Sequence, residues 1–155
     1  MNRLKRNCLY GAVLLCSGTT PVQSADIPFG GTAQDTCIIT VTQAGTLVAR
    51  NNDRRLTSRG PGTPGRAQVS ASGTGLTLSV DVPTAFDTEP AGDTTPENFR
   101  AWHRSNGATV YGITQAPEPL NAGVNNVRIH MDARKTGGNV FQAGSYSATV
   151  VLRCE

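Results

Sequence analysis

Apolar and polar residues alternate in several segments of the chain that follow residue 36. Near the end of the sequence, Tyr146, Ala148, Val150, Leu152 and Cys154 occupy every second position, with mainly polar residues between them. Alternation with a period of two places one set of side chains on each face of a β-strand. The segments with this period are 37–41, 76–82, 127–133 and 145–154. The pattern therefore predicts β-strands in these segments, each with one apolar face.

Short glycine-containing segments separate the predicted strands. Asn106-Gly107 lies between residues 99–104 and 108–113 and predicts a two-residue hairpin turn, because both positions of such a turn need positive φ. Two longer segments, 51–65 and 83–98, are rich in turn-forming residues and predict surface loops. Seven or eight short strands joined mainly by tight turns are typical of an antiparallel sandwich or barrel.

The first 25 residues have the organisation of a secretory signal. Three basic residues lie in the first six positions, followed by an apolar run at 9–16 and the small residues Ser24 and Ala25. That run is far shorter than the ~20 residues needed to span a bilayer. We predict a signal peptide at 1–25, a single domain at 26–155 with no integral membrane segment, and export to the periplasm, the cell surface or the medium.

The charge balance changes once this signal is set apart. The chain has 14 basic and 11 acidic residues, but Arg3, Lys5 and Arg6 belong to the signal. Eleven basic residues then balance eleven acidic ones, so the domain is near neutral. The sequence pI of about 8.9 gives no argument for a nucleic-acid partner.

Two cysteines, Cys37 and Cys154, remain in the predicted domain. Each lies in the apolar phase of its strand, and an exported protein meets oxidising conditions, so we predict a disulfide between them. A metal site or a reactive thiol is the alternative, but there is no CxxC motif and no histidine near either cysteine. The sequence predicts no metal site and no cofactor.

The remaining ionisable residues form no recognisable catalytic group. His130 and Asp132 share one face of a predicted strand, but no nucleophile motif accompanies them, so we expect an exposed, solvated face. His103 is the other histidine. We expect no single change at these three positions to abolish function, and we expect the protein not to be an enzyme.

Two clusters of like charge fall in the two predicted loops. The acidic cluster comprises Asp87, Glu89, Asp93 and Glu97, and its spacing does not match the EF-hand calcium-binding loop, so a solvated loop is expected. The basic cluster comprises Arg50, Arg54, Arg55, Arg59 and Arg66. Arginine suits carboxylate or phosphate groups, so this cluster is compatible with an anionic glycan or an acidic neighbour, or simply with solubility.

The segment 141–150, Phe-Gln-Ala-Gly-Ser-Tyr-Ser-Ala-Thr-Val, resembles the final strand of chaperone–usher pilins and of related secreted, spore-coat-U-type proteins. The resemblance implies an immunoglobulin-like sandwich that lacks one strand. The N-terminal extension of the next subunit fills the gap, after a periplasmic chaperone has filled it transiently. Two features depart from the family: Cys154 stands where such pilins usually have tyrosine, and the predicted bridge joins the first and last strands.

An extension with donor-strand character precedes the first predicted strand. Ile27, Phe29, Gly31 and Ala33 occupy every second position, although the segment could equally be a flexible lead-in. We therefore predict an antiparallel immunoglobulin-like β-sandwich that acts as a pilin-like, non-catalytic structural subunit. Its predicted partners are like subunits and a periplasmic chaperone, with those four residues binding the partner. The alternative is a self-complete surface or periplasmic binding module that recognises a protein or glycan through its loops.

Overall fold

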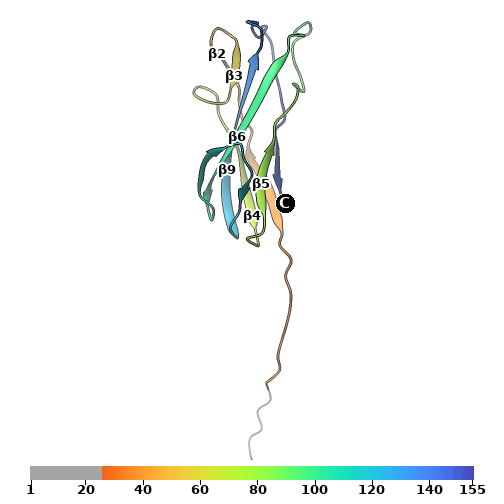
Figure 1. Ribbon diagram of the computed structural model, residues 1–155, viewed down its shortest axis with the longest axis vertical. Coiled ribbons are helices and arrows are strands. Elements are labelled where there is room, and N and C mark those ends of the chain that lie inside the picture. Colours follow the sequence, from red (N-terminus) through yellow and green to blue (C-terminus); the bar gives the residue numbers. More distant parts are fainter. Residues whose placement is uncertain (1–25) are drawn as a thin grey trace, which may run out of the picture. The chain divides into compact units, whose positions relative to one another are not determined.

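The computed structural model describes residues 26–155. Residues Ala33–Glu155 form one compact unit (Figure 1). The predicted signal at 1–25 lies outside the described residues. In the described part, every regular element is a β-strand, and no helix there is long and apolar enough to cross a membrane. Residues 26–36 precede the first strand and form none themselves.

In residues 26–155, ten strands form two antiparallel sheets. The larger sheet has seven strands: β1 (Cys37–Gln43), β2 (Val48–Arg50), β3 (Arg55–Thr57), β4 (Gly65–Ala71), β6 (Glu97–Gly107), β7 (Tyr111–Thr114) and β9 (Gly123–Lys135). The smaller sheet has three: β5 (Thr77–Asp81), β8 (Glu118–Pro119) and β10 (Val151–Cys154). The predicted β-sandwich is confirmed, with more strands than expected.

β9 is the central strand of the larger sheet. One of its edges pairs with β6 along most of its length, from Lys135 opposite Glu97 to Asn125 opposite Gly107. Its other edge pairs first with β4 and then with the short β3. Alternate residues of β9, including Val127, Met131 and Ala133, are buried. They contribute to two apolar clusters, one around Val69, Leu78 and Val127 and one around Met131, Ala133 and Phe141.

Three predicted boundaries differ from the structure. The segment 51–65 contains β3, and Glu97, predicted to lie in a loop, begins β6. The predicted Asn106-Gly107 turn instead lies at the end of β6, and the chain reverses before Tyr111. Gly107 has a φ of 127°, and a Cβ there would lie 2.4 Å from the carbonyl oxygen of Val124. This glycine is therefore required for the close approach of β6 to β9 rather than for the predicted two-residue turn.

The predicted last strand, 145–154, is paired along only part of its length. Residues Val151–Cys154 pair with β5, whereas in 145–150 the only bridge is between Ser147 and Thr88. The alternation predicted correctly which side chains point inward: Tyr146, Ala148 and Val150 pack against the second apolar cluster. Among residues 26–155, no strand pairs with residues 145–150 along their full length, and this incompletely paired segment defines the candidate site below.

His103 lies on the inward face of β6 and is fully buried. Its Nε2 donates a hydrogen bond to the Ala116 carbonyl at 3.0 Å, and its Nδ1 then accepts one from the Tyr111 hydroxyl at 2.8 Å. The neutral ring is thus fully satisfied. Burial lowers the pKa of His103 below its ordinary value of 6.5.

We expect the free energy of unfolding to fall as the pH drops below about 6.5. At these pH values His103 binds a proton in the unfolded chain, whereas in the folded protein its lowered pKa keeps the ring neutral. The slope contributed by one histidine is at most about 1.4 kcal/mol per pH unit. Denaturant unfolding of His103→Gln and of the wild type between pH 7 and pH 5 checks this. The variant should have the shallower slope, and parallel curves would refute the assignment to His103.

Candidate functional site: a groove between two strand edges

Two strands, β1 and β10, lie at the edges of their sheets. Within residues 26–155, β1 pairs only with β4, and β10 pairs only with β5. The predicted disulfide is present: it joins Cys37, where β1 begins, to Cys154, where β10 ends, with their Cα atoms 6.3 Å apart. The bridge holds the two edges together at one end. Among the described residues, no ladder of backbone hydrogen bonds joins them.

A groove of about 650 Å³ runs between β1 and the C-terminal segment. Its lining combines apolar side chains with polar residues, among them Thr46, Ser58, Ser147 and Thr149. The apolar residues that line it are Ile39, Val41, Ala44, Leu47, Ala67, Ile129, Met131, Tyr146, Ala148, Val150 and Leu152. Several of these also pack against the two core clusters, so the groove is an opening into the hydrophobic core.

The groove leaves apolar surface and backbone hydrogen-bonding groups uncovered. Val41, on the wall formed by β1, is 74% exposed. An edge strand with unpaired N–H and C=O groups is a template for another strand. The seven residues of β1 span about 20 Å at ~3.4 Å per residue, which suits an added strand of six or seven residues.

The four residues predicted to bind a partner lie in the extension. Ile27 is 74% exposed and Phe29 is 95% exposed, and a Cβ added at Gly31 would meet nothing within 4 Å. Single large apolar residues are common on protein surfaces, so the exposure of these two side chains does not by itself identify a binding segment. Within one chain, the structure leaves the side chains of Ile27 and Phe29 largely exposed.

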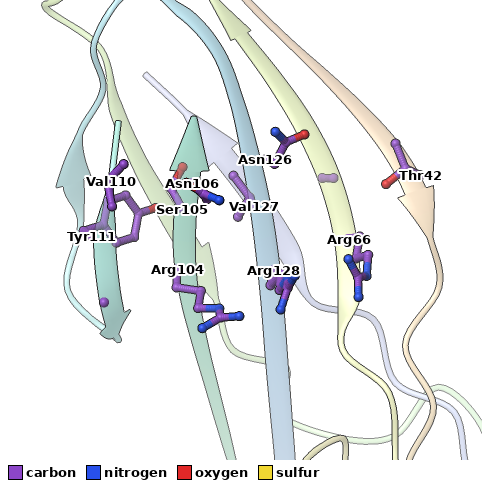
Figure 2. Close-up of a pocket in the computed structure, with 12 residues that line it drawn as sticks. Thr42, Arg66, Arg104, Ser105, Asn106, Val110, Tyr111, Asn126, Val127 and Arg128 are labelled. Atoms are coloured by element: carbon purple, nitrogen blue, oxygen red, sulfur yellow. The ribbon is translucent and has the colours of Figure 1, made fainter. Parts of the chain in front are cut away.

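A second surface lies on the outer face of the larger sheet (Figure 2). Arg66 on β4 and Arg104 on β6 both lie opposite Arg128 on β9, so three arginines form a row across three neighbouring strands. They border a depression of about 520 Å³. The sequence placed Arg66 in a loop cluster, which is wrong because it lies within β4. The row was missed because the three residues come from distant segments and only strand register brings them together.

The prediction that His130 and Asp132 lie on an exposed, solvated face is also wrong. Asp132 is buried: it forms an ion pair with Arg55 and accepts a hydrogen bond from Thr57 Oγ1 at 2.5 Å. Its partners hold it in the fold rather than orienting His130. Burial lowers the pKa of His130, and Arg59, Arg104 and Arg128 lower it further. In the described chain no cluster of three or more potential metal ligands occurs.

Arg128→Gln is expected to raise the free energy of unfolding by roughly 0.2–1 kcal/mol, because like charges directly opposite one another in a sheet repel. The gain should shrink as salt is added, since salt screens the repulsion. Denaturant unfolding at low and high salt checks this. Arg153→Gln, which removes an exposed arginine paired with Asp81, is the matched control and should not stabilise the protein.

Comparison with protein-family models, with curated proteins and with solved structures finds no match to this chain.

Proposed function

We propose that this protein is an exported, non-catalytic structural subunit that assembles by strand complementation. The apolar groove between the unpaired edges of β1 and the C-terminal segment carries this proposal. The occupant is the extension of a second copy, with Ile27, Phe29, Gly31 and Ala33 directed into the groove. A periplasmic chaperone would cover the same groove before assembly. The signal-like residues 1–25 and the disulfide support export.

Burial of apolar side chains favours insertion of the extension into the groove of a second copy. Burying Ile27 and Phe29 contributes roughly 1.5–3 kcal/mol each before ordering costs are subtracted. Backbone hydrogen bonds to the two strand edges add affinity that does not depend on sequence, and the alternating side chains set the register. Gly31 would lie where the groove has least room for a side chain.

The assembly state of the isolated protein tests the proposal. A strand-complemented polymer should give a ladder of species in detergent without heating and should collapse to the monomer when boiled. Deletion of residues 26–34 should abolish the ladder while leaving folded monomer. A wild-type protein that is monomeric in both conditions contradicts the proposal.

The arginine row supports a second candidate: a self-complete binding module that recognises an anionic glycan. Here the recognition surface is a strand face rather than the loops expected from the sequence. Three aligned arginines repel one another unless an anion compensates them, and arginine binds carboxylate and sulfate groups in bidentate fashion. Binding of a sulfated glycan to the wild type, lost in Arg128→Gln and retained in Arg153→Gln, would favour this candidate.

A further inference from the structure

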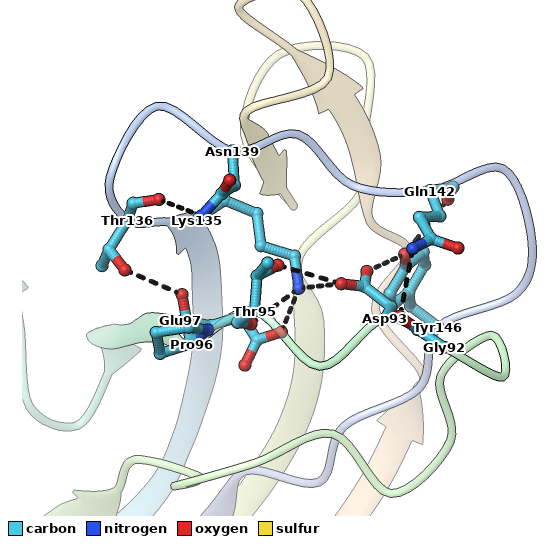
Figure 3. Close-up of polar contacts among 10 residues, drawn as sticks. All are labelled: Gly92, Asp93, Thr95, Pro96, Glu97, Lys135, Thr136, Asn139, Gln142 and Tyr146. Carbon is cyan, nitrogen blue, oxygen red and sulfur yellow. Dashed lines mark hydrogen bonds and ion pairs between the residues drawn. The ribbon is translucent and has the colours of Figure 1, made fainter.

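A lysine is buried together with two carboxylates at the end of β9 (Figure 3). The side chain of Lys135 is 0% exposed and that of Asp93 is 1% exposed, and Nζ lies 2.6 Å from Asp93 Oδ1. The same ammonium contacts the carboxylate of Glu97 and donates to the Thr95 carbonyl at 2.9 Å. The sequence pattern predicted Asp93 and Glu97 to be a solvated acidic loop, and the structure corrects this.

Aromatic rings surround the group. Nζ lies 5.0 Å from the centroid of the Phe141 ring, and Phe141 and Tyr146 pack edge to face. Phe86 contacts Phe99, Phe141 and Tyr146 in the same cluster. This apolar surrounding excludes water from the lysine and the aspartate.

We propose that Lys135 and Asp93 condense to form an intramolecular amide bond, with Glu97 as the proton shuttle. The nitrogen and the carboxyl group are already in contact, and an intramolecular reaction between fixed groups has an effective molarity of roughly 10⁵–10⁸ M. A water-poor site favours the neutral amide over two buried charges. The reaction needs no oxidant, reductant or further reactant.

The geometry assigns a role to each atom. Lys135 passes a proton to Asp93, leaving a neutral amine and a carboxylic acid. The amine nitrogen attacks Cγ of Asp93 and forms the N–C bond. Glu97 carries a proton from the nitrogen to Oδ1, the C–Oδ1 bond breaks, and Oδ1 leaves as water. Oδ2 remains as the amide oxygen.

Tyr146 and burial distinguish Asp93 from Glu97 as the bonded partner. The Tyr146 hydroxyl donates to Asp93 Oδ2 at 2.5 Å, where negative charge develops as the nitrogen attacks. Glu97 is the more exposed carboxylate of the two, and its side chain has no such donor among the hydrogen bonds described. Asp93 is thus placed to react and Glu97 to move protons.

The ionisation of the group sets its resting state. Burial, the largest influence, opposes charge on both partners, but hydrogen bonds from Lys135, Tyr146 and Thr95 leave the pKa of Asp93 below its usual range. The two carboxylates raise the pKa of Lys135 despite its burial. The group therefore rests as an ion pair, and reaction proceeds from the neutral pair reached by one proton transfer.

Such a bond would brace the candidate groove. It would tie the segment before β6 covalently to β9, and Tyr146, which contacts Asp93, lines the groove wall. The proposal does not depend on the proposed assembly, because the bond forms within one chain.

Mass spectrometry of the purified exported protein, with its disulfide reduced, tests the bond. The measured mass of the wild type should be lower, by the mass of one water molecule, than the mass calculated from the sequence of the exported chain. Tryptic digestion should yield residues 67–100 joined to residues 135–153, with fragmentation placing the link between Asp93 and Lys135. Full mass, a water loss without this joined pair, or a link to Glu97 would each overturn the proposal.

Conservative variants test the roles. Glu97→Gln keeps a hydrogen-bonding side chain but cannot relay the proton as a carboxylate does, and Lys135→Arg keeps the charge but lacks a reactive amine. Both should fold and have full mass. Asp81→Asn, which breaks the exposed ion pair with Arg153, is the control and should retain the water loss. A water loss persisting in Glu97→Gln would overturn the role of Glu97.

Discussion

Ile27→Asp and Phe29→Asp are each expected to abolish polymer formation while leaving the sandwich folded. Each change removes roughly 1.5–3 kcal/mol of apolar burial and also places a charge in an apolar groove. The fold should survive because the compact unit begins at Ala33 and the first strand at Cys37. Immunoblots of unheated samples, compared with the total amount of folded protein, measure the effect.

Two further variants separate a donor strand from a flexible leader. Pro28→Asp alters a position between Ile27 and Phe29, whose side chain would face away from the groove. This variant should therefore leave polymer largely intact. Gly31→Leu should block assembly, which a leader without a fixed register does not predict. Equal damage from Pro28→Asp and Phe29→Asp would contradict the alternating register.

Removing the disulfide is expected to lower the free energy of unfolding by roughly 2–5 kcal/mol. Cys37 and Cys154 are 117 residues apart, so the bridge restricts nearly the whole domain in the unfolded state. It also holds the edges of β1 and β10 together at one end of the groove. Denaturant unfolding of the double variant Cys37→Ser, Cys154→Ser measures the loss.

The reduced wild type is the control for this experiment. It should unfold at the same denaturant concentration as the double variant, because both lack only the bridge. A difference of less than about 1 kcal/mol between the oxidised and reduced wild type would contradict a stabilising role.

Alternation predicted the long strands and the inward phase of both cysteines, because a period of two is visible in any strand that has one apolar face. It could not predict β2, β3 and β8, which are two or three residues long and show no period. It also could not predict that no other strand in the described part of the chain pairs with residues 145–150 along their full length. Side-chain phase is a property of one strand, whereas edges are a property of the whole sheet.

Charged residues were predicted least well. Asp93 lies in a segment rich in proline and acid, where a solvated loop is the ordinary expectation. Its burial depends on Lys135, 42 residues away, and on Tyr146, 53 residues away. Likewise, Arg66, Arg104 and Arg128 are aligned only by the register of β4, β9 and β6. Pairings of this kind arise from tertiary structure and leave no local signal.

Photo-cross-linking from position 29 tests strand complementation most directly. A photoreactive residue replaces Phe29, and the assembled protein is a mixture of isotopically light and heavy chains. The account predicts adducts between different chains that map to β1 and to residues 146–152, with far fewer when the probe is at position 32, in the opposite phase. Adducts confined to one chain, or no adducts with the groove, would contradict it.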